Sequence, residues 1–196
     1  MIRLQHLAIQ GVLFISIAYV AGCNSKDACL PTSSQGEKRD DLECRFTLGR
    51  TAYGRKDYKQ AAEHWGSVVR ANPNSERDKT IIAIAHGTLG YLFYYGKGVK
   101  EDRKRAVELY KTAVRLGDLE SRQHLGFAFS DQTNDFYDPV TAYAWYRSVE
   151  HHYKIILEEE TDKRVLQTAK DGMARLKPQL SDGDLKIAEE KSSLIE

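Results

Sequence analysis

The chain has 196 residues, with 29 Lys and Arg against 28 Asp and Glu, so its formal net charge at pH 7 is +1. This balance excludes the strong positive charge with which most nucleic-acid-binding proteins attract a polyanion, and we expect no nucleic-acid partner. With 41% hydrophobic and 29% charged residues and a mean hydropathy of −0.54, the composition fits one globular domain. It excludes a disordered chain and a protein with many membrane spans.

The beginning of the chain is unusually apolar. Residues 1–22 carry one charged side chain, Arg3, and the stretch from Leu7 to Gly22 is almost entirely apolar. A short positive start followed by such a run is typical of a secretory signal peptide. The alternative of an uncleaved membrane anchor is disfavoured, because the run is shorter than the ~20 residues that cross a bilayer as a helix.

The end of this run, Val20-Ala21-Gly22-Cys23, resembles the bacterial lipobox. The resemblance implies cleavage before Cys23 and attachment of palmitate-like acyl chains, with ordinary secretion as the alternative. Each buried methylene adds ~0.8 kcal/mol of membrane affinity, so two or three chains would form a stable anchor. The next residue is Asn24, not the Asp that retains enterobacterial lipoproteins at the inner membrane. By that resemblance we expect an outer-membrane lipoprotein that faces the periplasm of a Gram-negative bacterium.

Lipidation of Cys23 would leave one pair of cysteines, Cys29 and Cys44. An even pair in an oxidising compartment indicates a disulfide, with two free thiols as the alternative. In the chain-entropy model, closing a loop of this length stabilises the fold by ~3 kcal/mol. We expect residues 23–41 to form a flexible tether.

The middle of the chain repeats with a period of 36 residues, as from Leu89 to Leu125. The same spacing relates Gly90 and Gly126, Phe93 and Phe129, Asp102 and Asp138, Ala106 and Ala142, and Tyr110 and Tyr146. So many matches in register indicate a structural repeat. In each unit, Leu, Gly and an aromatic mark one face of a first helix, and Ala and Tyr mark one face of a second. We expect helix–turn–helix units in which the Gly allows the two helices to approach closely.

Helix start and stop signals agree with this division. Asp102 can accept hydrogen bonds from the first turn of a second helix, and Gly117 can end that helix in the left-handed conformation. Asp138 occupies the same position in the next unit, and the Pro139 after it is tolerated at a first helical position.

The run from Leu89 to Gly117, with its turn Gly96-Lys97-Gly98-Val99, resembles the Sel1-like repeat. The following unit keeps the pattern but has Gln132-Thr133-Asn134-Asp135 in place of the glycine turn, so we expect a turn of altered shape. Upstream, one more set of residues resembles a tetratricopeptide repeat, whose turn between helices is four residues shorter: Leu48, Gly49, Ala52, Asp57, Tyr58, Ala61, Trp65, Val68 and Pro73.

Residues 154–196 contain no aromatic side chain. Apolar spacing predicts a helix over 160–176, and Ser181 begins another with Asp184 as its capping partner, before fraying from Ser192. A solenoid needs a polar end cap, and we assign these helices to that role. The expected architecture is therefore an all-α solenoid of one tetratricopeptide-like and two Sel1-like units. Its expected boundaries are a signal peptide at 1–22, a tether at 23–41, repeats at 42–153 and a C-terminal cap at 154–196.

Motifs for catalysis and nucleotide binding are absent from the sequence. Gly96-Lys97-Gly98 lacks the spacing and the Ser or Thr of a phosphate-binding loop, so we expect a structural turn and no nucleotide. His151 and His152 are adjacent and therefore point in different directions on a helix, which disfavours a zinc site. No Ser, Cys or Lys has the setting of a nucleophile. We expect no enzyme activity, no cofactor and no metal.

One loop gathers oxygen ligands of the kind that hard cations favour, on Asp131, Asn134, Asp135 and Asp138. The loop lacks the spacing and the central Gly of an EF-hand. A solvated loop that ends in a helix cap is the expected structure, with a calcium site as the alternative.

Stacked helix hairpins form a concave surface that repeat proteins use to hold peptides or other proteins. Transferred by position from the tetratricopeptide pattern, the groove residues are expected to be Phe46, Arg50, Tyr53, Ile84, Tyr91, Tyr94, Gln123 and Phe127. Exposed Tyr and Arg are frequent energetic centres of interfaces. We expect a lipid-anchored, non-enzymatic scaffold that binds a protein or peptide partner in the cell envelope. The alternatives are a cell-wall enzyme or ligand binder and a pilotin-like assembly factor for an outer-membrane complex.

Overall fold

The computed structural model describes residues 42–156 and 160–195, and all regular structure within them is helical. Eight α-helices and one short 3-10 helix follow each other along the described chain. They are α2 (Leu42–Gly54), α3 (Tyr58–Val68), α4 (Glu76–Tyr95), α5 (Arg103–Arg115), α6 (Leu119–Ser130), α7 (Pro139–Ile156), α8 (Glu160–Leu176), η1 (Lys177–Gln179) and α9 (Asp182–Ser193). None of these helices is long and apolar enough to cross a membrane.

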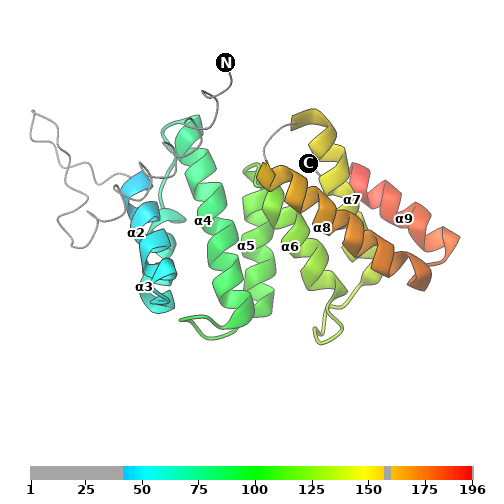
Figure 1. The fold of residues 1–196 in the computed structure, drawn as a ribbon, viewed down its shortest axis with the longest axis horizontal. Coiled ribbons are helices and arrows are strands. Elements are labelled where there is room, and N and C mark those ends of the chain that lie inside the picture. The colour runs from blue at the N-terminus through cyan, green and yellow to red at the C-terminus, as the bar shows by residue number, and fades with distance from the viewer. Residues whose placement is uncertain (1–41, 157–159, 196) are drawn as a thin grey trace, which may run out of the picture.

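Successive helices pair as hairpins that stack side by side. The pairs α2 and α3, α4 and α5, and α6 and α7 form three hairpins, and α8 and α9 both pack against α7. Figure 1 shows the stack progressing from α2 and α3 at one end to α9 at the other. The predicted all-α solenoid is thus confirmed.

A glycine and an aromatic ring meet inside each hairpin. A Cβ added to Gly90 on α4 would lie 2.8 Å from Cε1 of Tyr110 on α5, and one added to Gly126 on α6 would lie 2.6 Å from the Tyr146 ring on α7. Both distances are too short for a side chain, so only glycine permits the observed approach. This confirms the role predicted for the repeated glycine.

Helix ends follow the predicted capping residues. The Asp102 carboxylate accepts a hydrogen bond from the backbone amide of Arg105 at 2.9 Å, and that of Asp138 accepts one from Thr141 at 3.0 Å. Gly117 has a φ of +97°, which is the left-handed region expected after α5. Three residues separate α2 from α3, whereas seven separate α4 from α5, in agreement with the shorter first turn.

The C-terminal helices close the stack as predicted, but the last described residues do not fray as predicted. Helix α8 begins and ends at the expected residues, and Ser181 forms a capping box with Asp184 at the start of α9. The prediction of fraying from Ser192 is wrong. Helix α9 continues to Ser193, Ser192 is buried, and the carbonyl of Ile195 accepts a hydrogen bond from the buried Arg122 at 3.3 Å.

The side of α8 toward the repeats is apolar. Val165, Ala169 and Met173 are buried in one cluster with Tyr146 and Val149 of α7. Burying this apolar stripe stabilises the fold by roughly 25 cal/mol for each Å² of apolar surface removed from water. The contact explains why the last hairpin needs a further helix against its open face.

Candidate functional site

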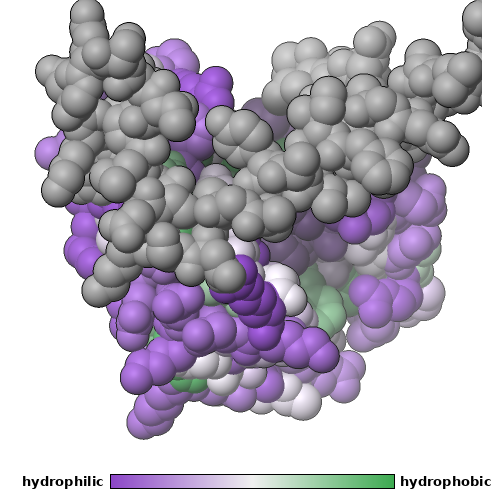
Figure 2. All heavy atoms as spheres, turned by 60° about the vertical axis from the view of Figure 1, so that its left-hand side comes forward, coloured by the Kyte–Doolittle hydropathy of each residue, from purple (hydrophilic) through white to green (hydrophobic). Residues whose placement is uncertain are grey.

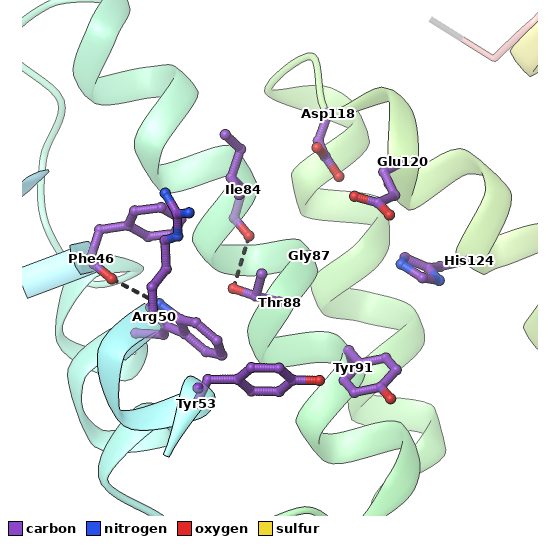
Figure 3. A pocket seen from close by; sticks show the side chains of 12 residues that line it. Phe46, Arg50, Tyr53, Ile84, Gly87, Thr88, Tyr91, Asp118, Glu120 and His124 are labelled. Carbon is purple, nitrogen blue, oxygen red and sulfur yellow. Dashed lines mark hydrogen bonds between the residues drawn. The ribbon is translucent and has the colours of Figure 1, made fainter. Parts of the chain in front are cut away.

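The concave side of the first three hairpins contains a cavity of about 690 Å³. Side chains of α2, α4 and the start of α6 form most of its wall (Figure 3). The lining residues are Phe46, Arg50, Tyr53, Gly54, Trp65, Ile84, Gly87, Thr88, Tyr91, Asp118, Glu120 and His124. We call this cavity the groove. Its volume falls in the ~300–1,000 Å³ range of ligand sites.

Helical spacing explains why these side chains share one wall. Phe46, Arg50 and Tyr53 lie four and three residues apart on α2, and Ile84 and Tyr91 lie seven apart on α4. Residues at these spacings project from the same face of a helix. Stacking the hairpins then brings the faces together, and Figure 3 shows the labelled side chains converging on one space.

A row of aromatic rings begins in the groove at Tyr53 and Tyr91 and continues beyond it to α6. The ring of Tyr53 lies 6.4 Å from that of Tyr91, which lies 4.7 Å from that of Tyr95. Tyr94 continues the row, 5.0 Å from Tyr95 and 5.8 Å from Phe127. Tilted and edge contacts of this kind stabilise both rings beyond their burial and hold them in defined orientations.

The glycine turn of the second hairpin fixes this row. The Lys97 ammonium donates a hydrogen bond to the Tyr91 hydroxyl at 2.7 Å and lies 4.6 Å from the Tyr91 ring centroid. It also lies 5.5 Å from the Tyr58 ring and 5.8 Å from the Tyr95 ring. A cation over aromatic faces is attracted by their quadrupoles. Lys97 therefore has a structural role in the turn, where it contacts both the hydroxyl and the ring of Tyr91.

Gly96 and Gly98 give that turn its shape. Both have positive φ angles, +61° and +68°. A Cβ at Gly98 would lie 2.3 Å from the backbone nitrogen of Lys59, so the turn touches the backbone at the start of α3. The contact joins the first hairpin to the second.

Charged residues lie on opposite sides of the groove. Arg50 projects from α2, whereas Asp118 and Glu120 lie at the start of α6, across the cavity in Figure 3. The Asp118 carboxylate accepts a hydrogen bond from the backbone amide of Ser121 at 2.9 Å and so caps α6. Burial raises the pKa of Asp118, and the hydroxyl and backbone amide of Ser121 oppose that shift.

His124 contributes an uncharged ring at neutral pH. Burial lowers its pKa from the ordinary 6.5, and the nearby Asp118 only partly opposes that shift. The His124 ring stacks on Tyr110, with centroids 5.0 Å apart and planes at 24°. The groove therefore has one positive and two negative side chains, and its histidine adds no charge at pH 7.

Five of the eight predicted groove residues line this cavity: Phe46, Arg50, Tyr53, Ile84 and Tyr91. Phe127 is 39% exposed and Gln123 is half-buried, but neither lines it. The placement of Tyr94 needs correction. Its side chain is 2% exposed, and its hydroxyl donates a hydrogen bond to Asp131 at 2.8 Å, so it is a buried member of the aromatic row and does not line the groove.

Sequence reasoning missed the acidic side of the groove. Asp118 caps α6 and Glu120 and His124 lie in its first two turns, whereas the positional transfer selected Gln123 and Phe127 on this helix. Gly117 followed by Asp118 is a helix stop followed by a helix cap. This signal predicts where α6 begins, and so could have identified Asp118 and Glu120 as residues at the start of a first helix.

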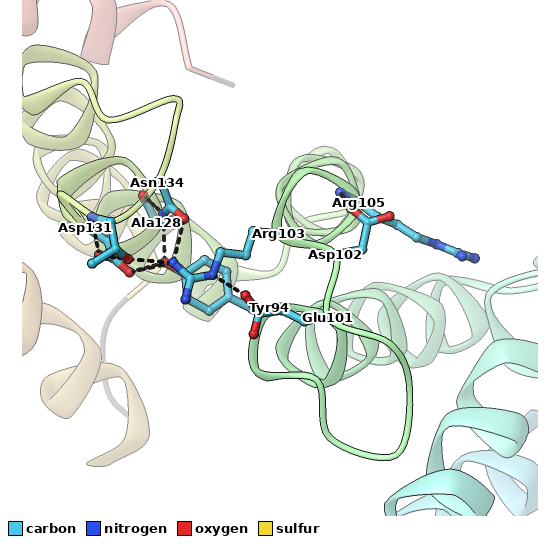
Figure 4. Close-up of polar contacts among 9 residues, drawn as sticks. Tyr94, Glu101, Asp102, Arg103, Arg105, Ala128, Asp131 and Asn134 are labelled. Carbon is cyan, nitrogen blue, oxygen red and sulfur yellow. Dashed lines mark hydrogen bonds and ion pairs between the residues drawn. The ribbon is translucent and has the colours of Figure 1, made fainter.

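The acidic loop between α6 and α7 is bound to the preceding hairpin. The Asn134 side chain donates hydrogen bonds to the Tyr94 hydroxyl at 2.9 Å and to the Ala128 carbonyl at 2.7 Å. Arg103 donates to the Asn134 side-chain oxygen at 2.9 Å (Figure 4). Asn134 is buried, so the expectation of a solvated loop is wrong at this residue. The positively charged guanidinium of Arg103 occupies the space between loop oxygens that would otherwise be available to bind a metal cation.

No cluster of three or more His, Cys, Asp or Glu side chains suited to a metal ion occurs among residues 42–156 and 160–195. Cys44 on α2 is disulfide-bonded. Its predicted partner Cys29 and the predicted lipidation site Cys23 lie outside the described residues, as do the signal peptide and the tether. The Cys29–Cys44 pairing therefore stays a prediction.

The outer surface is mostly hydrophilic in the view of Figure 2, where apolar atoms are visible mainly in recesses. Among the residues that the structure describes, five large apolar side chains are nevertheless exposed: Ile84, Tyr95, Phe127, Ile187 and Leu194. The first three lie on α4 and α6, next to or within the groove. This clustering is what distinguishes the concave side, because scattered apolar residues are normal on any surface.

Comparison with known proteins supports the repeat assignment. The model of the Sel1 repeat family matches residues 85–118, which include the end of α4 and all of α5. No curated protein matches the chain. Among solved structures, the chain is similar to c5321, a protective antigen present in uropathogenic Escherichia coli strains that displays an SLR fold, with 17% identity and a TM-score of 0.66.

That match covers 95% of this chain and 37% of the solved chain, so the protein spans little more than a third of the antigen's length. At this identity the likeness concerns the fold. The chain thus contains a Sel1 repeat at residues 85–118 and folds as a Sel1-like repeat α-solenoid.

Proposed function

We propose that this protein is a non-enzymatic scaffold, anchored by lipid on Cys23 to the outer membrane and facing the periplasm, that binds a protein or peptide partner in its groove. The observation that carries the proposal is the groove itself. Its about 690 Å³ volume is lined by aromatic, apolar and charged side chains drawn from three hairpins. Sel1-like repeat folds are consistent with scaffolds for protein–protein interaction.

The groove has the composition of a recognition surface. Phe46, Tyr53 and Tyr91 provide large, rigid contact areas, and Arg50 has no ion-pair partner among the described residues. Aromatic and Arg side chains carry much of the energy of protein interfaces. The polar groups of the groove also have structural roles, since Asp118 caps α6 and His124 stacks on Tyr110.

Site-specific photocrosslinking in cells tests the groove assignment. A photoreactive residue is placed at Ile84, which is 38% exposed in the groove, or at Ile187, which is 48% exposed on α9. We expect a discrete covalent partner at position 84 that is absent at position 187. Equal adducts at both positions, or none at position 84, would contradict the groove assignment.

The anchor is tested separately. Metabolic labelling with an alkyne-modified palmitate is expected to label the wild-type chain and to leave Cys23→Ser unlabelled. Membrane fractionation should then place the labelled chain in the outer membrane. Labelling that persists in Cys23→Ser would contradict the lipidation site, and label in the inner membrane would contradict the location.

A further inference from the structure

The acidic side of the groove is open toward the cavity because of a glycine. Gly87 on α4 faces the start of α6, and a Cβ added to it would lie 3.0 Å from Oδ2 of Asp118 and 2.8 Å from Oγ of Ser121. Any larger residue at position 87 would cover the Asp118 carboxylate. Both Gly87 and Asp118 line the cavity, so the missing side chain exposes a carboxylate at its wall.

The Ser121 side chain supports the Asp118 carboxylate from behind. Ser121 is fully buried and does not line the cavity. Its hydroxyl and its backbone amide both oppose the rise that burial causes in the pKa of Asp118. Both groups therefore favour the charged form of the carboxylate that the cavity wall presents.

Glu120 adds a second carboxylate to this wall. Its ion pair with Arg164 of α8 has a nitrogen–oxygen distance of 3.7 Å between side chains that are 48% and 72% exposed. An ion pair this exposed contributes little, so the Glu120 carboxylate can exchange Arg164 for another cation.

Two aromatic rings line the same cavity as the two carboxylates. Tyr91 and His124 both line the cavity, with ring centroids 6.4 Å apart. A Lys or Arg side chain has an apolar stem that packs on rings and a charged head that pairs with carboxylates. Arg50 on the opposite side repels a second cation and attracts an acidic group.

We infer that the groove recognises a basic segment of its protein partner, with one Lys or Arg side chain packed over Tyr91 and paired with Asp118 and Glu120. This inference rests on the proposed function and narrows it to one class of sequence. An acidic residue of the same segment is accommodated at Arg50. A segment that carries only acidic residues is rejected by the two carboxylates.

The experiment is a selection from a phage-displayed library of random seven-residue peptides on the full chain, purified in detergent micelles. Asp118→Asn removes the charge and keeps a good helix cap, since Asn and Asp cap helices about equally well. Combined with Glu120→Gln, it forms the test variant. Asp57→Asn is the matched control, because Asp57 caps α3 in the same way, by accepting from the Gln60 amide at 3.1 Å, and does not line the groove.

We expect peptides selected on the wild type and on Asp57→Asn to be enriched in Lys or Arg, and the enrichment to disappear on the test variant. A synthetic copy of the leading peptide should bind the test variant about tenfold or more weakly by calorimetry. Groove-dependent peptides without basic residues, or equal affinity for the test variant, would overturn the inference and leave the proposed function standing. Peptides selected equally well by Ile84→Trp, which fills part of the groove without changing its charge, would overturn both.

Discussion

Asn134→Ala provides a severe test of how the second and third hairpins are joined. The buried Asn134 side chain makes three hydrogen bonds, to Tyr94, to the Ala128 carbonyl and from Arg103. Each contributes about 1 kcal/mol net, and the bond to the charged Arg103 more. Alanine also leaves the carbonyl of the fully buried Ala128 without this donor. The expected loss is about 3 kcal/mol in the free energy of unfolding.

The assay is thermal and urea unfolding of the full chain in detergent micelles. A loss of about 3 kcal/mol lowers Tm by roughly 6–12 °C in a protein of this size. Because repeats can unfold in steps, the fluorescence of Trp145 on α7 is measured in a Trp65→Phe background, where it reports the affected region. Gln132→Ala is the control, since Gln132 is exposed in the same loop. A loss below about 1 kcal/mol for Asn134→Ala, or equal losses in both variants, would refute the reasoning.

Three further predictions concern packing and pH. Gly90→Ala should destabilise the chain by about 1–3 kcal/mol, because the added Cβ would overlap the Tyr110 ring. Gly54→Ala is the control and should not destabilise the chain, because a Cβ there meets nothing within 4 Å. The midpoints of urea unfolding of the two variants are compared with that of the wild type. Burial alone would raise the pKa of Asp131, but hydrogen bonds from Thr133 and Tyr94 and the charge of Arg103 lower it below 3.8. Its stabilisation is therefore present above pH 3.8 and is lost as the pH falls further, so Asp131→Asn should flatten the acid limb of a stability–pH curve. Because the pKa of His124 is lowered in the folded chain, the unfolded chain binds a proton on His124 more tightly than the folded chain does. Stability should fall as the pH drops below 6.5, and His124→Phe, which keeps a ring on Tyr110, should reduce that slope; an unchanged slope would contradict this origin.

The repeat architecture could be predicted because each unit carries local signals that agree with its packing. Gly90 and Gly126 are followed at the same spacing by Tyr110 and Tyr146, and the same residues meet in space. The Asp102 cap likewise depends on hydrogen bonds to its own first turn. Such features need only a few neighbouring residues, so a sequence pattern captures them.

The groove was harder to predict because it depends on contacts between units. Tyr94 occupies a helix position that matches a groove residue, yet Asn134 and Asp131 of the next unit bind its hydroxyl and bury it. Asp118 reaches the cavity only because Gly87, on another helix, has no side chain to cover it. Neither relation follows from the pattern within one repeat.

The turn that defines the Sel1 repeat also shapes the groove. Gly98 can approach the backbone of α3 because it lacks a Cβ, and this contact places the neighbouring Lys97 over the ring of Tyr58. Lys97 then holds Tyr91 through its hydroxyl and its ring face. The groove residue Tyr91 is therefore oriented by the same contact that joins the first hairpin to the second. Any change that shifts the two hairpins must also move the aromatic wall, so the shape of the groove depends on the register of the repeats.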